Sequence, residues 1–217
     1  MRLLSIIFVV MFISAGAGAQ DYMLPLDTVK KVATEALPVF GELVTKDNLE
    51  TMGFKSLDDV KNVALDDAEP PLQVFMVRLD HLKEYQAGAD VNRLLTGGEM
   101  AFYPVTLTGQ VIAAVGVQKM KEKWEATSVG DAVLIRMLTD VRRQSIESTA
   151  LSPKSYFVVW VAALNLHFVA YRADDDLMLI PVQDDDAYEF KKGVALPAER
   201  VFEIILPAAR EHDGSPG

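Results

Sequence analysis

Hydrophobic residues near both ends of the chain recur every three or four positions, the spacing that places them on one side of an α-helix. The first such segment covers residues 26–44 and contains Pro38. Proline lacks an amide donor and its ring clashes with the preceding turn, so Pro38 should divide this segment. The last helix should begin at Pro197, because proline is favoured at the first helical position, with Val201 and Ile205 on its apolar side.

A third amphipathic helix is predicted to start at Gly130, in the middle of the chain. Val133, Met137 and Val141 follow one another at helical spacing, so we expect this side of the helix to be buried. Arginines should mark the side that faces water, and their position in the C-terminal half suits the helix dipole. The arginines assigned to the exposed side are Arg136, Arg142 and Arg143.

Runs of β-branched and aromatic residues predict the strands. Residues 72–79 are almost all apolar, which indicates a buried strand. Thr108 and Gly109 separate two apolar runs and predict a hairpin turn, so residues 101–129 should form a three-stranded meander. The predicted strands are 72–79, 102–107, 110–118, 124–129, 156–162, 166–172 and 177–182.

Two stretches lack regular spacing and should connect the predicted elements. Residues 66–71 contain three acids and two prolines, which makes them the best candidate linker. Residues 86–100 contain three glycines and only one predicted helical turn, at 90–95. Long loops in compact domains often carry function, so residues 86–100 are a candidate part of a binding site.

The N-terminal residues 1–19 have the pattern of a secretory signal peptide. Arg2 supplies the positive charge, residues 3–13 are apolar except for one serine, and Ala17 and Ala19 form an A-x-A cleavage pattern. The apolar stretch is too short to span a bilayer. We therefore expect an exported protein, periplasmic or secreted, that begins at Gln20 after cleavage.

The order of the predicted elements favours an α+β fold. Most predicted strands are joined by short turns, so we expect an antiparallel sheet of about 5–7 strands with helices packed on it. The predicted divisions are the signal peptide 1–19, a helical segment with its linker 20–71, an α+β region 72–211 and a frayed tail 212–217. Residues 20–71 and 72–211 should form one compact unit.

Composition excludes several kinds of partner and chemistry. Acidic residues outnumber basic ones by 31 to 21, so the chain should bind neither nucleic acid nor an anionic membrane surface. The sequence has no cysteine, which rules out a thiol nucleophile, a thiolate zinc site and a redox pair. The apolar stretch 155–172 is too short and too β-branched for a membrane span, so none is expected in the mature chain.

Motifs for metal binding, cofactor binding or catalysis are missing from the sequence. The aspartate runs 174–176 and 184–186 flank one predicted strand about 20 Å long, so they cannot share an ion, and neither has the spacing of an EF-hand loop. We interpret both as solvated turns. The three histidines have no zinc-site spacing, and no serine-nucleophile or phosphate-loop motif occurs. We expect no cofactor, no metal and no catalytic residue.

Aromatic residues concentrate in one segment, which supplies the candidate ligand-binding residues. Asn165 and His167 interrupt an otherwise apolar run, two positions apart. In a straight strand, Trp160 would lie on one face, while His167 and Tyr171 would lie on the other. The simpler interpretation is that His167 is a partly buried histidine at a sheet edge with its hydrogen bonds satisfied. The predicted ligand-binding residues are Trp160, Asn165, His167 and Tyr171.

Three classes of function remain open. The first is an exported, non-catalytic module that binds a small molecule or another exported protein. The second is an exported hydrolase that uses carboxylates, with or without His167. The third is a chaperone-like or inhibitory partner of an exported protein, which would pair through an edge strand. We favour the binding module and expect its site between residues 86–100 and the segment around Trp160 and His167.

Overall fold

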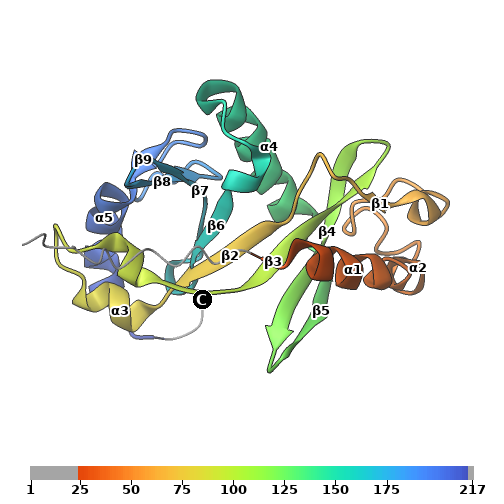
Figure 1. Ribbon diagram of the computed structural model, residues 1–217, viewed down its shortest axis with the longest axis horizontal. Coiled ribbons are helices and arrows are strands. Elements are labelled where there is room, and N and C mark those ends of the chain that lie inside the picture. The colour runs from red at the N-terminus through yellow and green to blue at the C-terminus, as the bar shows by residue number, and fades with distance from the viewer. Residues whose placement is uncertain (1–23, 215–217) are drawn as a thin grey trace, which may run out of the picture.

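Nine strands form a single sheet in the computed structural model, which describes residues 24–214 (Figure 1). The strand order is β5-β4-β3-β2-β6-β7-β8-β9, and β1 pairs with β3 outside this path. The predicted signal peptide, 1–19, lies outside the described residues. The strands are β1 Ala64–Leu65, β2 Leu72–Val77, β3 Leu95–Leu107, β4 Gln110–Met120, β5 Lys123–Gly130, β6 Phe157–Val161, β7 Leu166–Ala173, β8 Asp176–Pro181 and β9 Leu196–Pro197.

The predicted α+β class is confirmed, but the predicted number of strands was too low. The additional strands, β1 and β9, contain two residues each, too few to produce a recognisable alternation in the sequence. One pairing also differs from an antiparallel arrangement, because β2 and β6 are parallel. The chain returns from β2 to β6 through β3, β4, β5 and the long helix after β5, a connection long enough for a parallel pair.

The α-helices near both ends of the chain and the helix after β5 lie in the predicted segments. Pro38 divides the first segment as expected, and the two helices flank it. Ser56 and Asp59 exchange hydrogen bonds with each other's backbone amides at the start of a short 3₁₀ helix. The α-helices are α1 Leu26–Ala36, α2 Val39–Leu43, α3 Leu79–Glu84, α4 Ala132–Thr149 and α5 Ala198–Glu211. In the part of the chain that the structure describes, no helix is long and apolar enough to cross a membrane.

The buried side of α4 differs from the prediction. Arg142 is only 1% exposed, whereas Val133 is 64% exposed. Arg142 donates to the backbone oxygen of Pro70 and pairs with Glu69, so the segment 66–71 supplies a buried ionic partner. A buried arginine of this kind cannot be recognised from helical spacing, because its partner lies 73 residues away in the sequence.

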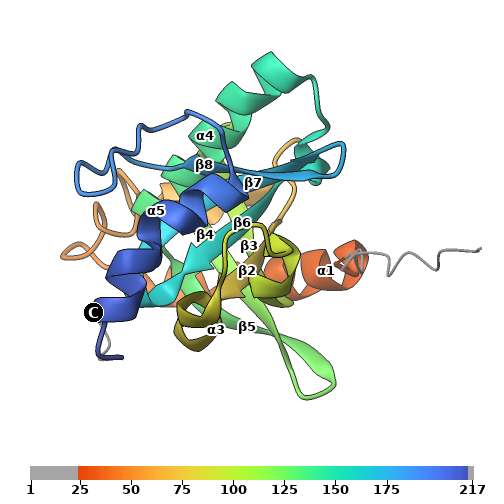
Figure 2. The ribbon, with the colours of Figure 1, turned by 90° about the vertical axis from the view of Figure 1, so that its left-hand side faces the viewer.

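Helices cover both faces of the twisted sheet, and they divide the core into three clusters. α4 packs on one face against β2, β4, β6 and β7, whereas α1 packs on the other face at the β3–β5 end. α3 and α5 cover that other face at the β6–β8 end. α4 and α1 lie on opposite sides of the sheet in both views (Figures 1 and 2). The N-terminal end of α4 leaves part of its sheet face uncovered.

The segment 86–100 is shorter as a loop than expected. The predicted helical turn is present as a 3₁₀ helix, Val91–Leu94, but β3 begins at Leu95. Two glycines in this strand, Gly97 and Gly98, have positive φ and coincide with a register shift between β2 and β3. This bulge breaks the regular alternation that would have identified the strand from sequence.

Candidate functional site

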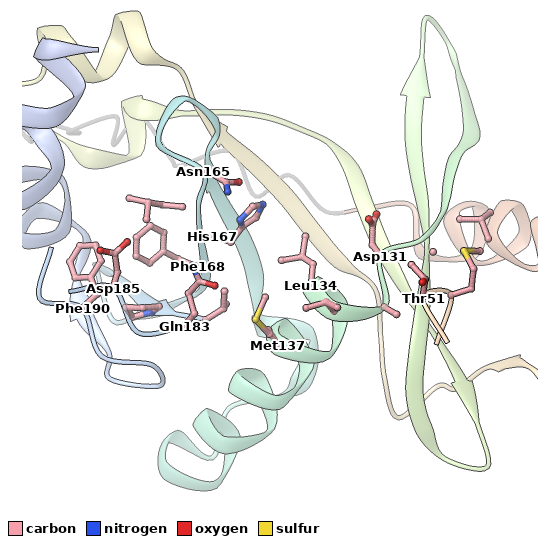
Figure 3. A pocket seen from close by; sticks show the side chains of 18 residues that line it. Thr51, Asp131, Leu134, Met137, Asn165, His167, Phe168, Gln183, Asp185 and Phe190 are labelled. Carbon is pink, nitrogen blue, oxygen red and sulfur yellow. The ribbon is translucent and has the colours of Figure 1, made fainter. Parts of the chain in front are cut away.

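A cavity of about 480 Å³ opens where α4 begins (Figure 3). It is bounded by the start of α4, by the adjacent ends of β7 and β8, by the loop that follows β8, and by the turn at Thr51 and Met52. Its lining is mainly apolar with a few polar side chains. The residues named in Figure 3 are Thr51, Asp131, Leu134, Met137, Asn165, His167, Phe168, Gln183, Asp185 and Phe190.

The entry into α4 shapes one wall of the cavity. Gly130 ends β5 with φ of 133°, and Asp131 follows in the left-handed region with φ of 52°. Aspartate and asparagine tolerate this region better than most residues, so the chain can turn sharply from strand to helix here. The Asp131 side chain makes no capping hydrogen bond to the helix. Its carboxylate therefore remains available to a ligand in the cavity.

The β6–β7 hairpin places two further polar residues at the cavity. Asn165 closes the connection between these strands with φ of 51°, and the strand β7 begins at the next residue. His167 lies opposite Trp160 in the antiparallel register. The imidazole and indole rings stack nearly parallel, with centroids 5.5 Å apart and an angle of 12° between their planes.

The electrostatic state of His167 follows from its position. Burial lowers the pKa of His167 below its usual value of about 6.5, and the negative charge of Asp131 opposes this effect only partly. His167 is therefore neutral at pH 7 and can both donate and accept a hydrogen bond. A neutral imidazole beside apolar walls suits recognition of an uncharged or hydrogen-bonding group.

The opposite wall is the loop that follows β8. Asp185 exchanges backbone hydrogen bonds with Phe190, at 3.0 and 2.9 Å. Its Oδ1 accepts from the amides of Ala187 and Tyr188, at 3.0 and 3.3 Å. These bonds fix the loop locally and direct the Phe190 ring into the core beside Phe168, with centroids 5.7 Å apart.

The four predicted ligand-binding residues do not all meet in this cavity. Asn165 and His167 line it, and Trp160 lies behind His167 without belonging to the lining. Tyr171 lies farther along β7 and packs against Tyr156, with centroids 5.6 Å apart. The assignment of Trp160 and His167 to opposite faces was wrong, because the hairpin reverses the chain between them and pairs them directly.

The segment 86–100 does not contribute to this cavity. Leu94 belongs to the core cluster on the α5 side of the sheet, and Asn92 accepts a hydrogen bond from Arg172. The cavity instead uses side chains that the sequence did not single out as site residues. Asp131 was identified only as part of a helix start, and the turn at Thr51 lies about 80 positions before it along the chain.

Metal binding has no support from side-chain clustering. Within residues 24–214, no three histidine, aspartate or glutamate side chains are grouped closely enough to hold a metal ion.

Comparisons with known proteins found no matching family model, no matching curated protein and no matching solved structure. The function must therefore be inferred from the chemistry of the cavity itself.

Proposed function

We propose that this chain is an exported, non-catalytic binding module that holds a small ligand in the cavity at the start of α4. The volume of about 480 Å³ falls in the range of about 300–1,000 Å³ that is usual for small-molecule sites. Such sites combine apolar walls with a few polar groups that orient the ligand. Here Val133, Leu134 and Met137 supply apolar surface, while Asn165 and His167 supply hydrogen-bonding groups.

The observation that carries this proposal is the position of His167. It is a half-buried, neutral imidazole that borders the cavity and is backed by the Trp160 ring. This support restricts the rotation of the imidazole, so its orientation is set before a ligand arrives. A preorganised polar group of this kind lowers the entropic cost of binding.

Native mass spectrometry of the protein recovered from the exported fraction of its own organism tests the proposal. We expect extra mass on the wild-type monomer. Val133 is exposed and lines the cavity, so Val133→Trp should fill the entrance and remove that mass. Glu147→Trp places the same side chain on an exposed position farther along α4, and this control should keep the ligand.

Two results would contradict the proposal. A bare wild-type mass under conditions that preserve weak complexes would show that the exported protein carries no ligand. Equal ligand mass on wild type and Val133→Trp would place any binding elsewhere on the protein.

A hydrolase remains the second candidate because two carboxylates and a histidine border the same cavity. Asp131 lies close enough to His167 to influence its pKa, as a base and its orienting carboxylate would. A panel of ester, amide and glycoside substrates tests this candidate directly. Turnover by the wild type that disappears in Asp131→Asn, with folding unchanged, would establish an enzyme and exclude the non-catalytic function.

A further inference from the structure

The charged side chains that line the cavity are all acidic. Asp131 and Asp185 carry negative charge, no lysine or arginine belongs to the lining, and His167 is neutral at pH 7. Asp131 and Asp185 lie toward opposite ends of the lining, with His167 and Leu134 between them (Figure 3). A ligand that extends along the cavity therefore has a carboxylate close to each end of the cavity.

Neither carboxylate is neutralised by the protein. No lysine or arginine among residues 24–214 lies within salt-bridge distance of Asp131 or Asp185, although the neighbouring Asp186 pairs with Lys191. Asp185 uses Oδ1 for two backbone amides, whereas its Oδ2 accepts no hydrogen bond from the described residues. Both carboxylates thus retain acceptor capacity for a donor that the chain does not provide.

The positive end of the α4 dipole does not cancel the negative charge of these two carboxylates. Its free amides represent about half a positive charge, which is smaller than the full negative charge on Asp131 at the same end. The second carboxylate, Asp185, makes the balance more negative. The net charge of −10 on the whole chain also raises the local concentration of cations.

We propose that the ligand of this cavity is an organic cation that joins a protonated amine to an apolar group, a conclusion that rests on the proposed binding function. The amine would donate charge-assisted hydrogen bonds to Asp131 or Asp185. The apolar group would lie against Val133, Leu134 and Met137. The protein would reject the corresponding carboxylate because it offers that anion no cationic side chain.

Three probes with the same aromatic body test the charge preference: 2-phenylethylamine, 2-phenylethanol and phenylacetate. Binding is followed by NMR through the His167 ring and the Trp160 indole, with Trp124 in the α1 cluster as the internal control. We expect the amine to bind about tenfold more tightly than phenylacetate and to weaken as salt is added.

Variants that each remove one negative charge test which carboxylate binds the amine. Asp131→Asn or Asp185→Asn should weaken amine binding about fivefold. Asp175→Asn removes the same charge from an exposed turn at the other end of β7 and β8, and this control should leave the affinity unchanged.

The outcomes separate this inference from the function on which it rests. If the alcohol or phenylacetate binds as tightly as the amine and shifts the His167 signal, the cation preference is wrong while the binding cavity stands. An equal loss of affinity in Asp175→Asn would attribute the effect to net charge and overturn the assignment of the two carboxylates. If no probe shifts His167 or Trp160, the assignment of an organic cation is overturned, whereas the binding function itself is decided by the native mass measurement.

Discussion

The imidazole of His167 stacks on the indole of Trp160, with ring centroids 5.5 Å apart and planes 12° from parallel. The two residues are directly paired across the β6–β7 hairpin. The stack lies on the same sheet face as α4, in the part that the helix leaves uncovered. The imidazole therefore borders the cavity, and the indole supports it from behind. The stack also buries the Trp160 Nε1 atom, which has no hydrogen-bond partner among the described residues.

Stability should depend on pH through His167. Burial lowers the pKa of His167 in the folded protein relative to about 6.5 in the unfolded chain, so the unfolded chain binds more protons below that pH. The free energy of unfolding should therefore fall as the pH drops through 6.5 and level off below the folded pKa. Urea unfolding at a series of pH values measures this decrease.

The histidine variants assign the pH effect. His167→Gln should remove much of the decrease, whereas His81→Gln, at an exposed position in α3, should retain it. A direct NMR titration of His167 should give a midpoint below 6.5. A midpoint above 6.5 would show that the attraction of Asp131 outweighs desolvation.

Two of the buried tyrosines, Tyr85 and Tyr156, should respond oppositely to loss of their hydroxyl groups. The Tyr85 hydroxyl is buried without a hydrogen-bond partner among residues 24–214, so Tyr85→Phe should raise the free energy of unfolding by about 1 kcal/mol. The Tyr156 hydroxyl lies 3.2 Å from the Ser145 Oγ and 2.6 Å from the Thr149 Oγ1. Tyr156→Phe should lower that free energy by about 1 kcal/mol. Urea denaturation checks both changes, and a loss of stability in Tyr85→Phe would indicate an ordered water at its hydroxyl.

Removal of Glu69 should cost far more stability than removal of its neighbour Asp67. Glu69 pairs with Arg142, which is 1% exposed, and also accepts from Arg143 at 2.7 Å. Glu69→Ala would leave a buried guanidinium without its counter-ion and should destabilise the fold by about 3 kcal/mol.

Asp67→Ala is the matched control, because Asp67 pairs with the partly exposed Lys30 and is itself 82% exposed at its side chain. Its loss should change stability very little, because water and salt screen an exposed ion pair. Equal effects of the two substitutions in chemical denaturation would contradict a special role for the buried pair.

Gly53 should tolerate no side chain, because it follows the Thr51–Met52 turn and lies against β4. A Cβ at residue 53 would lie 2.1 Å from the backbone oxygen of Ile112. Gly53→Ala must move this turn and should lower stability by about 3 kcal/mol, with loss of ligand from the cavity.

Gly109 provides the comparison because it has a similar positive φ of 80°, and a Cβ at residue 109 would meet no atom within 4 Å. Gly109→Ala should cost only the left-handed backbone strain, about 1 kcal/mol. Thermal unfolding of both variants separates the steric clash from the strain, and equal losses would contradict the clash.

Local patterns were sufficient to predict most of the helices and strands. The division at Pro38 and the hairpin at Thr108 and Gly109 depend on backbone chemistry within a few residues, and both are confirmed. The α+β class followed from the order of these elements. Strand β3 was shortened in the prediction because the bulge at Gly97 and Gly98 hides its first residues.

The sequence by itself thus determined the elements, the fold class and the acidic, cysteine-free character of this protein. Only the tertiary structure decided that β2 and β6 lie side by side in parallel, that Arg142 is buried against Glu69, and that His167 stacks on Trp160. It also brought Thr51, Asp131 and Asp185 to one cavity. The physical reason is that periodicity reports which side of an element is apolar, whereas pairing partners and cavity walls depend on packing between segments far apart in the chain.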